Sequence, residues 1–299
     1  MRLTIETRTK INAWLRVLPK EEGATLHGLE SLFLPIALGD RLMVDASLSE
    51  TPRFVLSSNR PDLVPCNTVQ KAWSAFVDAC PAAGGRPSFQ IAVHLDKRIP
   101  EQTGLGAGSG DAGTMLLLLN QLHGFPFNGG QLHAIACHVG SDVGFFVESG
   151  PCIVRGTGDQ TKRLPPLPHL TCCIALPSFR VNTGSAYGLL DSAMADNGTV
   201  AVDPSVSLES VVEALRKLEP LSLRGTSRLN SFETTLGDNT AGFLSIRSVL
   251  VASGAVLAGL SGSGSAVFGI YAERAAASAA ALEVRRRVSA VRTFVAEIL

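Results

Sequence analysis

The sequence predicts a fold that mixes α-helices and β-strands, of the α/β or α+β class, arranged as two domains. Its 299 residues are many for one hydrophobic core and enough for two domains in succession. Hydrophobic residues make up 45% and charged residues only 17%, and 29 residues are glycine. This composition is typical of a small-residue-rich enzyme rather than a disordered or coiled-coil chain. Strand and helix patterns occur in both halves, which gives the mixed class.

Two periodicities predict the individual elements. Alternating apolar residues predict strands, and apolar residues that recur every three or four positions predict helices. Short strands are expected through the first sixty residues, and individual strands at 9–18, 31–38, 89–95, 170–176, 266–271 and 291–299. Helices are expected at 67–79, 114–122, 131–137, 209–218 and 274–287. A loop is expected at 81–87, and strand and turn are expected at 143–155.

A proline-rich segment divides the chain. Residues 164–168 read Leu-Pro-Pro-Leu-Pro, and such a run suits a linker better than a helix or an inner strand. We therefore expect an N-terminal domain at 1–165 and a C-terminal domain at 166–299.

Charge and cysteine content narrow the class of function. Lysine plus arginine and aspartate plus glutamate both number 26, and this balance argues against a nucleic-acid partner. The basic run at 285–287 is expected to be a solvated helix face. The six cysteines include no C-x-x-C pair, which predicts reduced thiols in a cytoplasmic protein. Neither a signal peptide nor a membrane span is predicted, and the oligomeric state stays open between monomer and weak dimer.

The strongest local signal is a glycine-rich segment at 99–113. Its glycines let the backbone approach an anion closely, and the helix expected after it offers unpaired N–H groups and a positive dipole end. The segment therefore predicts phosphate binding, and Ser109 could add a hydroxyl donor or a metal ligand. The residues expected to hold a nucleotide here are Gly104, Leu105, Gly106, Ala107, Gly108, Ser109 and Gly110. The alternative is a tight turn that only caps the helix.

Rival nucleotide motifs fit this segment less well. No lysine follows the glycines, as a P-loop would need. Residues 108–113 match G-x-G-x-x-G, but the preceding strand is expected to end near Leu95 and no acid lies near position 133. A dinucleotide-binding turn is therefore disfavoured. A second glycine run, 260–266, is either a hairpin loop or a segment that closes over the same site.

The glycine-rich segment resembles the P-x-x-x-G-L-G-x-G-S motif of the GHMP kinases, the family of galactokinase and of homoserine, mevalonate and phosphomevalonate kinases. Three further segments resemble one member of that family, a kinase whose acceptor carries a cytidine diphosphate group. They are residues 10–12 with 27–33, residues 140–146 and residues 260–264. Together these matches span nearly the whole chain.

The resemblance implies an α+β fold with an S5-like N-terminal domain and a ferredoxin-like C-terminal domain. It implies an active site in the cleft between them, ATP and Mg²⁺ as cofactors, and a small-molecule acceptor. Asp142 matches the family's catalytic base and Lys10 its lysine partner. The positions that match acceptor contacts are Asn12, His27, Thr183 and Tyr187, with His27 at the cytosine. Asn67 matches a segment beside the adenine.

Each of these residues also has an ordinary structural alternative. Lys10 could be a surface lysine, Asp142 a helix N-cap, His27 a structural histidine and Asn67 the cap of the helix that follows it. The case for function depends on their joint occurrence with a phosphate-type segment.

The chain also departs from the family at three positions. Leu26 stands where the family usually has a tyrosine before the histidine, Gly110 replaces a second serine, and Gly144 replaces a proline. These departures bear on the acceptor more than on the reaction. Another GHMP kinase with a different acceptor, or a catalytically inactive GHMP-fold binding protein, are the alternatives.

Overall fold

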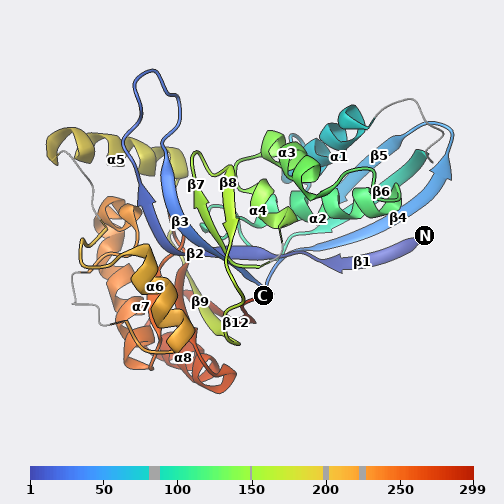
Figure 1. Cartoon of the computed structure of the whole chain (residues 1–299). Coiled ribbons are helices and arrows are strands. Elements are labelled where there is room, and N and C mark those ends of the chain that lie inside the picture. Colours follow the sequence, from blue (N-terminus) through green and yellow to red (C-terminus); the bar gives the residue numbers. More distant parts are fainter. Residues whose placement is uncertain (81–87, 149, 198–201, 222–226) are drawn as a thin grey trace. The chain divides into compact units, whose positions relative to one another are not determined.

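The computed structural model describes residues 1–80, 88–148, 150–197, 202–221 and 227–299 (Figure 1). The expected loop at 81–87 lies outside these ranges. The chain forms two units, and both are discontinuous in sequence. The first unit comprises Met1–Thr9, Ala37–Glu101 and Gly106–Ser149, and the second comprises Lys10–Ile36, Gln102–Leu105 and Gly150–Leu299. The domain boundary expected at residue 165 stays a prediction.

The first unit contains one four-stranded sheet with helices on one face (Figure 1). Its strand order is β1 (Arg2–Glu6), β4 (Arg41–Ser49), β6 (Ser88–Asp96) and β5 (Arg53–Ser58). Only the β5–β6 pair is parallel among these pairs. The helices are α1 (Thr68–Ala79), α2 (Ala107–Leu122), α3 (Gly129–Val139) and α4 (Val143–Val147), and a 3₁₀ turn covers Pro61–Leu63.

Alternation along β4 and β6 explains the core of this unit. Leu42, Val44 and Ala46 point to one face of β4, as do Ile91 and Val93 in β6, and all are buried. Helix α2 is apolar on most sides and is therefore buried along most of its length.

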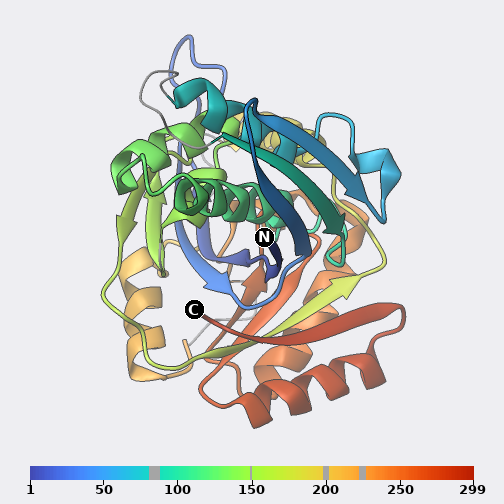
Figure 2. The ribbon, with the colours of Figure 1, turned by 90° about the vertical axis from the view of Figure 1, so that its right-hand side faces the viewer.

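The described residues of the second unit form two sheets and four helices. One sheet has the order β2 (Thr9–Val17), β3 (Leu29–Ile36), β7 (Cys152–Arg155) and β8 (Gln160–Arg163). The other has the antiparallel order β10 (Leu257–Leu260), β11 (Val267–Tyr271), β9 (Thr171–Pro177) and β12 (Val291–Glu297). The helices are α5 (Thr183–Asn197), α6 (Leu208–Lys217), α7 (Thr240–Ala252) and α8 (Arg274–Arg287). Figure 2 shows α8 beside β12, with which it packs.

Two isolated backbone bridges extend from the β2–β3 sheet, one of them to the end of the other sheet. Leu15 of β2 pairs with Asn230, and Ile36 of β3 pairs with Ile298 just after β12. The apolar core beneath α7 and α8 includes Tyr271, whose hydroxyl donates to the Leu250 carbonyl at 3.0 Å. Two short 3₁₀ turns, Ser231–Thr235 and Gly237–Asn239, lead into α7.

Most expected elements are confirmed, and so is the α+β class. The predicted start of the second helix is wrong. Helix α2 begins at Ala107 and not at residue 114, so the later glycines of the motif are helical. Residues 143–147 form helix α4 rather than strand, although β7 follows as expected. Helices α5 and α7 and strands β8 and β10 were not expected from the sequence.

Two further structural facts concern membrane-spanning helices and the cysteine thiols. None of the helices in the described parts of the chain has the length and apolar character that crossing a membrane requires. Burial raises the pKa of the Cys172 and Cys173 thiols to about 12, so both are inert core residues at neutral pH.

Candidate active site

The first turn of α2 offers backbone donors to an anion. Gly106 is the N-cap residue, with φ of 67° in the left-handed region, and it supplies no side-chain cap. The N–H groups at a helix start lack partners within the helix, and the helix dipole favours negative charge there. Thr68, the first residue of α1, donates its hydroxyl to the Gly108 carbonyl at 2.7 Å and so ties the two helix starts together.

The glycines of the motif serve different purposes. A Cβ on Gly110 would lie 1.8 Å from the Arg8 carbonyl oxygen, so this position needs glycine for packing. A Cβ on Gly104, where φ is +76°, would lie 2.0 Å from the Ser261 carbonyl oxygen. At Gly108 the nearest atom would be the Thr68 hydroxyl at 3.5 Å, an ordinary contact. Of these three glycines, only Gly108 has room at the position where a side chain would lie.

Asn67 caps helix α1. Its side-chain oxygen accepts a hydrogen bond from the Val69 N–H at 2.9 Å, and its amide donates to the Leu63 carbonyl at 2.8 Å. The capping alternative is therefore confirmed. A contact of Asn67 with the adenine stays a prediction.

Lys10 is buried in the second unit. Only 4% of the residue is exposed, and its ammonium donates to the side-chain oxygen of Asn12 and lies 4.5 Å from the centre of the Phe33 ring. The Asn12 amide in turn donates to the Ser31 hydroxyl at 3.0 Å. The surface-lysine alternative is therefore wrong, since burying an ammonium is costly without such partners.

The two glycine runs meet beside this lysine. The Ser261 hydroxyl donates to the Gly104 carbonyl at 2.9 Å and accepts from the Asn12 N–H at 3.2 Å. The Lys10 N–H donates to the Leu105 carbonyl at 2.9 Å. The second unit thus brings Lys10 and Asn12 together with Gly104 and Leu105.

His27 lies in a polar and aromatic cluster of the same unit. Its side chain is 4% exposed, and its Nδ1 is 2.8 Å from the Leu18 carbonyl. Its Nε2 lies 2.8 Å from Asp191, at an angle that leaves this nitrogen without a well-aligned hydrogen bond. The ring stacks on Tyr187 with centroids 5.2 Å apart. A hydrogen bond from Lys20, followed by the nearby His27, lowers the pKa of Asp191.

Helix α5 carries the other two expected acceptor contacts. Thr183 and Tyr187 are four positions apart and so lie on one face of the helix. The Thr183 hydroxyl is 2.9 Å from the Ser263 hydroxyl of the second glycine run. Tyr187 also meets Phe232 edge to face, at 5.0 Å between centroids.

Asp142 lies at the N-terminus of α4 in the first unit and is half-buried. It occupies the N-cap position, but its side chain does not cap the helix. Lys10 and Asp142 belong to different units, so their joint action stays a prediction.

Sequence reasoning missed several polar residues that support these positions. Asn230 is fully buried, and its amide donates to the Leu260 and Gly262 carbonyls at 2.9 and 2.8 Å. Asp40, Lys97 and Asp111 form a buried ionic cluster in the first unit. The one sequence signal for this cluster was that Asp111 lies within the glycine-rich segment. The described residues contain no group of three or more histidine, cysteine, aspartate or glutamate side chains arranged to hold a metal.

Two family models match the chain. The GHMP kinases N terminal domain matches residues 67–152, and the GHMP kinases C terminal domain matches residues 206–290. A 4-diphosphocytidyl-2-C-methyl-D-erythritol kinase of Anaeromyxobacter sp. (strain K) is 33% identical over 295 residues, covering 96% of this chain and 86% of the relative. A kinase of the same name from Symbiobacterium thermophilum is 30% identical, covering 92% of each chain.

Solved structures agree with these matches. The crystal structure of a 4-(cytidine 5'-diphospho)-2C-methyl-D-erythritol kinase is similar with a TM-score of 0.75 and 29% identity, covering 99% of each chain. A homoserine kinase from Cytophaga hutchinsonii has a TM-score of 0.64 at 16% identity, covering 98% of this chain and 94% of that one, which shows a shared fold.

Proposed function

We propose, from the premise that this chain belongs to the GHMP kinase family, that it phosphorylates the 2-hydroxyl of 4-diphosphocytidyl-2-C-methyl-D-erythritol in non-mevalonate isoprenoid precursor biosynthesis. It is an ATP-dependent small-molecule kinase. The observation that carries the proposal is the buried Lys10–Asn12 pair beside Gly104, in a chain similar to kinases of this name over more than nine-tenths of its length. A buried, hydrogen-bonded ammonium next to a phosphate-type segment suits phosphoryl transfer better than mere binding.

The proposed reaction is one displacement at phosphorus. The acceptor oxygen forms a bond to the γ-phosphorus, the bond from that phosphorus to the bridging oxygen of ADP breaks, and Asp142 takes the acceptor's proton. Lys10 is proposed to stabilise the negative charge that develops in the transition state. The N–H groups at the start of α2 hold phosphate oxygens, since a loose transition state needs positioning and charge neutralisation above all.

Mg²⁺ fits this proposal as a companion of ATP. Because the described residues contain no ready cluster of acidic ligands, the ion would be held mainly by phosphate oxygens, with the Ser109 hydroxyl as a ligand from the chain. When bound, it neutralises charge on the β- and γ-phosphates.

The acceptor's cytidine end is proposed to lie against His27, Thr183 and Tyr187. The Nε2 of His27 is buried and lacks a well-aligned partner, so it is suited to a polar edge of a base. Tyr187 supplies an aromatic face, which here covers the His27 ring. We also propose that the protein acts in the cytoplasm on small molecules alone, as a monomer or weak dimer.

Steady-state kinetics with two acceptors test the proposal. Purified protein with Mg–ATP should release ADP in the presence of 4-diphosphocytidyl-2-C-methyl-D-erythritol. The analogue that lacks cytidine should have a far higher KM. Equal kinetics for both acceptors would favour a GHMP kinase with a different acceptor, and no ADP release with any acceptor would favour a binding protein.

A further inference from the structure

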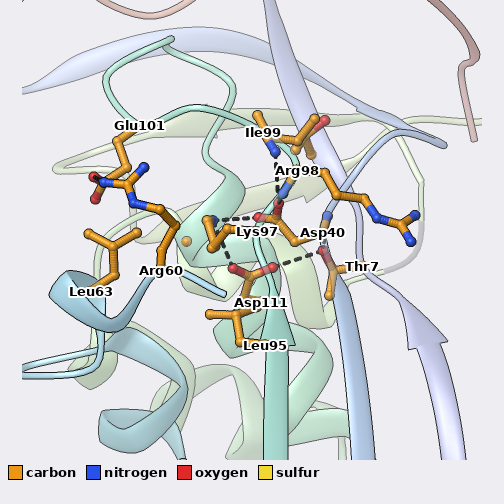
Figure 3. Close-up of polar contacts among 12 residues, drawn as sticks. Thr7, Asp40, Arg60, Leu63, Leu95, Lys97, Arg98, Ile99, Glu101 and Asp111 are labelled. Carbon is orange, nitrogen blue, oxygen red and sulfur yellow. Dashed lines mark hydrogen bonds and ion pairs between the residues drawn. The ribbon is translucent and has the colours of Figure 1, made fainter. Parts of the chain in front are cut away.

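Lys97 is a buried lysine directly after strand β6, where the chain enters the glycine-rich segment. Its side chain is 8% exposed, and its ammonium forms ion pairs with Asp40 and, at 3.1 Å, with Asp111 (Figure 3). Asp40 is 0% exposed and Asp111 is 1% exposed. Three charged groups therefore share an interior site that the proposed mechanism does not use, and burying them is costly unless each keeps its partners.

Asp40 holds the entry to the glycine-rich segment. One of its carboxylate oxygens accepts hydrogen bonds from the N–H groups of Arg98 and Ile99, at 2.6 and 2.8 Å, while the other accepts from Lys97 (Figure 3). Residues 97–99 are thus fixed through a single buried carboxylate, by bonds that are stronger because the acceptor is charged.

Asp111 holds the other end of the segment, in the first turns of α2. Its carboxylate accepts from Lys97 and, at 2.8 Å, from the Thr7 hydroxyl. The Thr7 hydroxyl also accepts the Asp40 N–H at 2.9 Å, which closes a ring of four residues from four separate segments. Gly110, the neighbour of Asp111, packs closely on the Arg8 backbone, so the helix start has little freedom to shift.

The charges of the cluster bear on anion binding. When both carboxylates are ionised, they and the one ammonium carry a net charge of −1, close to a helix start that is proposed to bind phosphate. Without the ammonium, two carboxylates would remain, and both their mutual repulsion and their field would oppose an anion. Burial works to lower the pKa of Lys97, but Asp111 and Asp40 raise it by more, so the ammonium stays charged.

We propose that Lys97 is a positioning residue for ATP binding, because it ties the entry of the glycine-rich segment to the start of α2 and balances the carboxylates beneath it. The inference rests on the proposed function, in which the α2 start binds phosphate. Lys97 acts through Asp40 and Asp111 and is not proposed to touch the nucleotide.

Lys97→Met tests this inference, with Mg–ATP as the probe in calorimetry and in steady-state kinetics. The variant should bind Mg–ATP about tenfold or more weakly, because small displacements of a positioned site are expensive. The KM of the acceptor should stay within about twofold of the parent value, since the effect is specific to the nucleotide. Lys97→Arg keeps the charge and should recover part of the affinity.

Two matched controls separate positioning from general loss of stability. Ile91→Ala opens the core beneath the same strand, β6, and should lower Tm without weakening Mg–ATP binding. Lys217→Met removes an exposed lysine and should change neither. The inference is overturned if folded Lys97→Met binds Mg–ATP like the parent, or no more weakly than Ile91→Ala at a similar loss of Tm.

A second variant keeps the test decisive if Lys97→Met does not fold. Asp111→Asn leaves the Lys97–Asp40 pair but removes the charged link to α2, and it should weaken Mg–ATP binding while the acceptor KM stays constant. Because the substitution also removes a negative charge near the phosphate site, weaker binding would report lost positioning and not an altered field. Unchanged binding by folded Asp111→Asn would then overturn the inference. If the parent protein itself fails to bind Mg–ATP, the proposed function fails first, and the two failures are distinguishable.

Discussion

Single residues of this chain differ sharply in how much the surrounding protein constrains them. Lys10 is buried with a hydrogen-bond partner and an aromatic ring beside it, whereas Asp142 is half-buried and starts a helix that its side chain does not cap. Proton transfer from the acceptor is the role proposed for the Asp142 carboxylate.

Asp142→Asn keeps the size of the side chain and removes its negative charge. Loss of a general base typically lowers the rate by about 10²–10⁴-fold, so kcat should fall by that factor while Tm changes little. Steady-state kinetics beside a thermal melt measure both. Asp238→Asn, at an exposed aspartate, is the matched control and should retain full activity. A folded Asp142→Asn with normal kcat would exclude Asp142 as the base.

Tyr187 and Leu26 occupy the two positions proposed to flank the cytidine end of the acceptor. Leu26 is 60% exposed, so it shields little, and Phe33 cannot take its place because that ring is buried under Lys10. Base–aromatic stacking contributes about 1–3 kcal/mol per base. Tyr187→Ala should therefore raise the KM of the cytidine substrate, and Leu26→Tyr should lower it, with little change in kcat because stacking is similar in ground and transition states.

The control for this pair lies on the same helix. Leu189→Ala removes an exposed apolar side chain of α5 and should leave both KM values unchanged. The KM of ATP should be constant in all three variants. If Tyr187→Ala and Leu26→Tyr both leave the acceptor KM unmoved, the protein does not bind cytosine there.

At the scale of elements, helix α2 offers a paired test of its glycines. Gly108→Ala meets only the Thr68 hydroxyl at 3.5 Å and should fold normally, but its methyl group occupies space proposed for phosphate. We expect weaker Mg–ATP binding, by about tenfold, with an unchanged Tm. Gly110→Ala collides with the Arg8 backbone and should instead lose about 1–3 kcal/mol of stability. Calorimetry and thermal melts compare the two, and the reverse pattern would exclude Gly108 from the phosphate site.

The position of α2 also shows where prediction from sequence failed. Glycine is a poor helix former, so propensity alone places the helix start after the glycines. Close packing overrides this, since Gly110 and Gly113 let α2 approach the Arg8 backbone and the Phe146 side chain. Residues 143–147 were missed for a related reason: a single five-residue turn is too short to show a period.

Residues of the candidate site that belong to a family motif were predictable from the sequence, and residues that only support the motif were not. Lys10, Asn12, His27 and Tyr187 were identified by resemblance, and the structure places them in one unit. The Asp40–Lys97 pair joins residues 57 positions apart. No local pattern links such positions, because their contact arises only when the sheet forms.

For the whole molecule, two buried acids should make stability depend on pH. Burial raises the pKa of Asp111 to about 7, against the effect of Lys97, and burial likewise raises the pKa of Glu233 to about 7, against the effect of Arg247. The groups that face Asp111 are Lys97, Asp40 and the Thr7 hydroxyl. Both folded-state pKa values lie above the ordinary values of 3.8 and 4.5.

The sign of the effect follows from proton binding. Between about pH 4 and pH 7 the folded protein holds these protons while the unfolded chain has lost them, so the free energy of unfolding falls as pH rises. Asp111→Asn removes one titrating group. It should reduce the fall in the free energy of unfolding between pH 5 and pH 8 by on the order of 2 kcal/mol. Urea unfolding at both pH values measures it, with Glu209→Gln at an exposed carboxylate as the control. An unaltered pH dependence in Asp111→Asn would contradict the prediction.

The discontinuity of the two units has a consequence for the order in which the chain can fold during synthesis. Strand β2 leaves the ribosome early, yet its backbone bonds reach Leu229 and Ser231, more than two hundred residues later. The Asn12 N–H donates to the Ser261 hydroxyl, which is synthesised later still. The edge of β2 that does not pair with β3 must therefore remain unpaired until residues 229–261 have been synthesised, and exposed strand edges are prone to wrong pairing. A nascent chain stalled before residue 229 should be sensitive to protease in β2, and should gain protection there only once residues 229–261 have emerged.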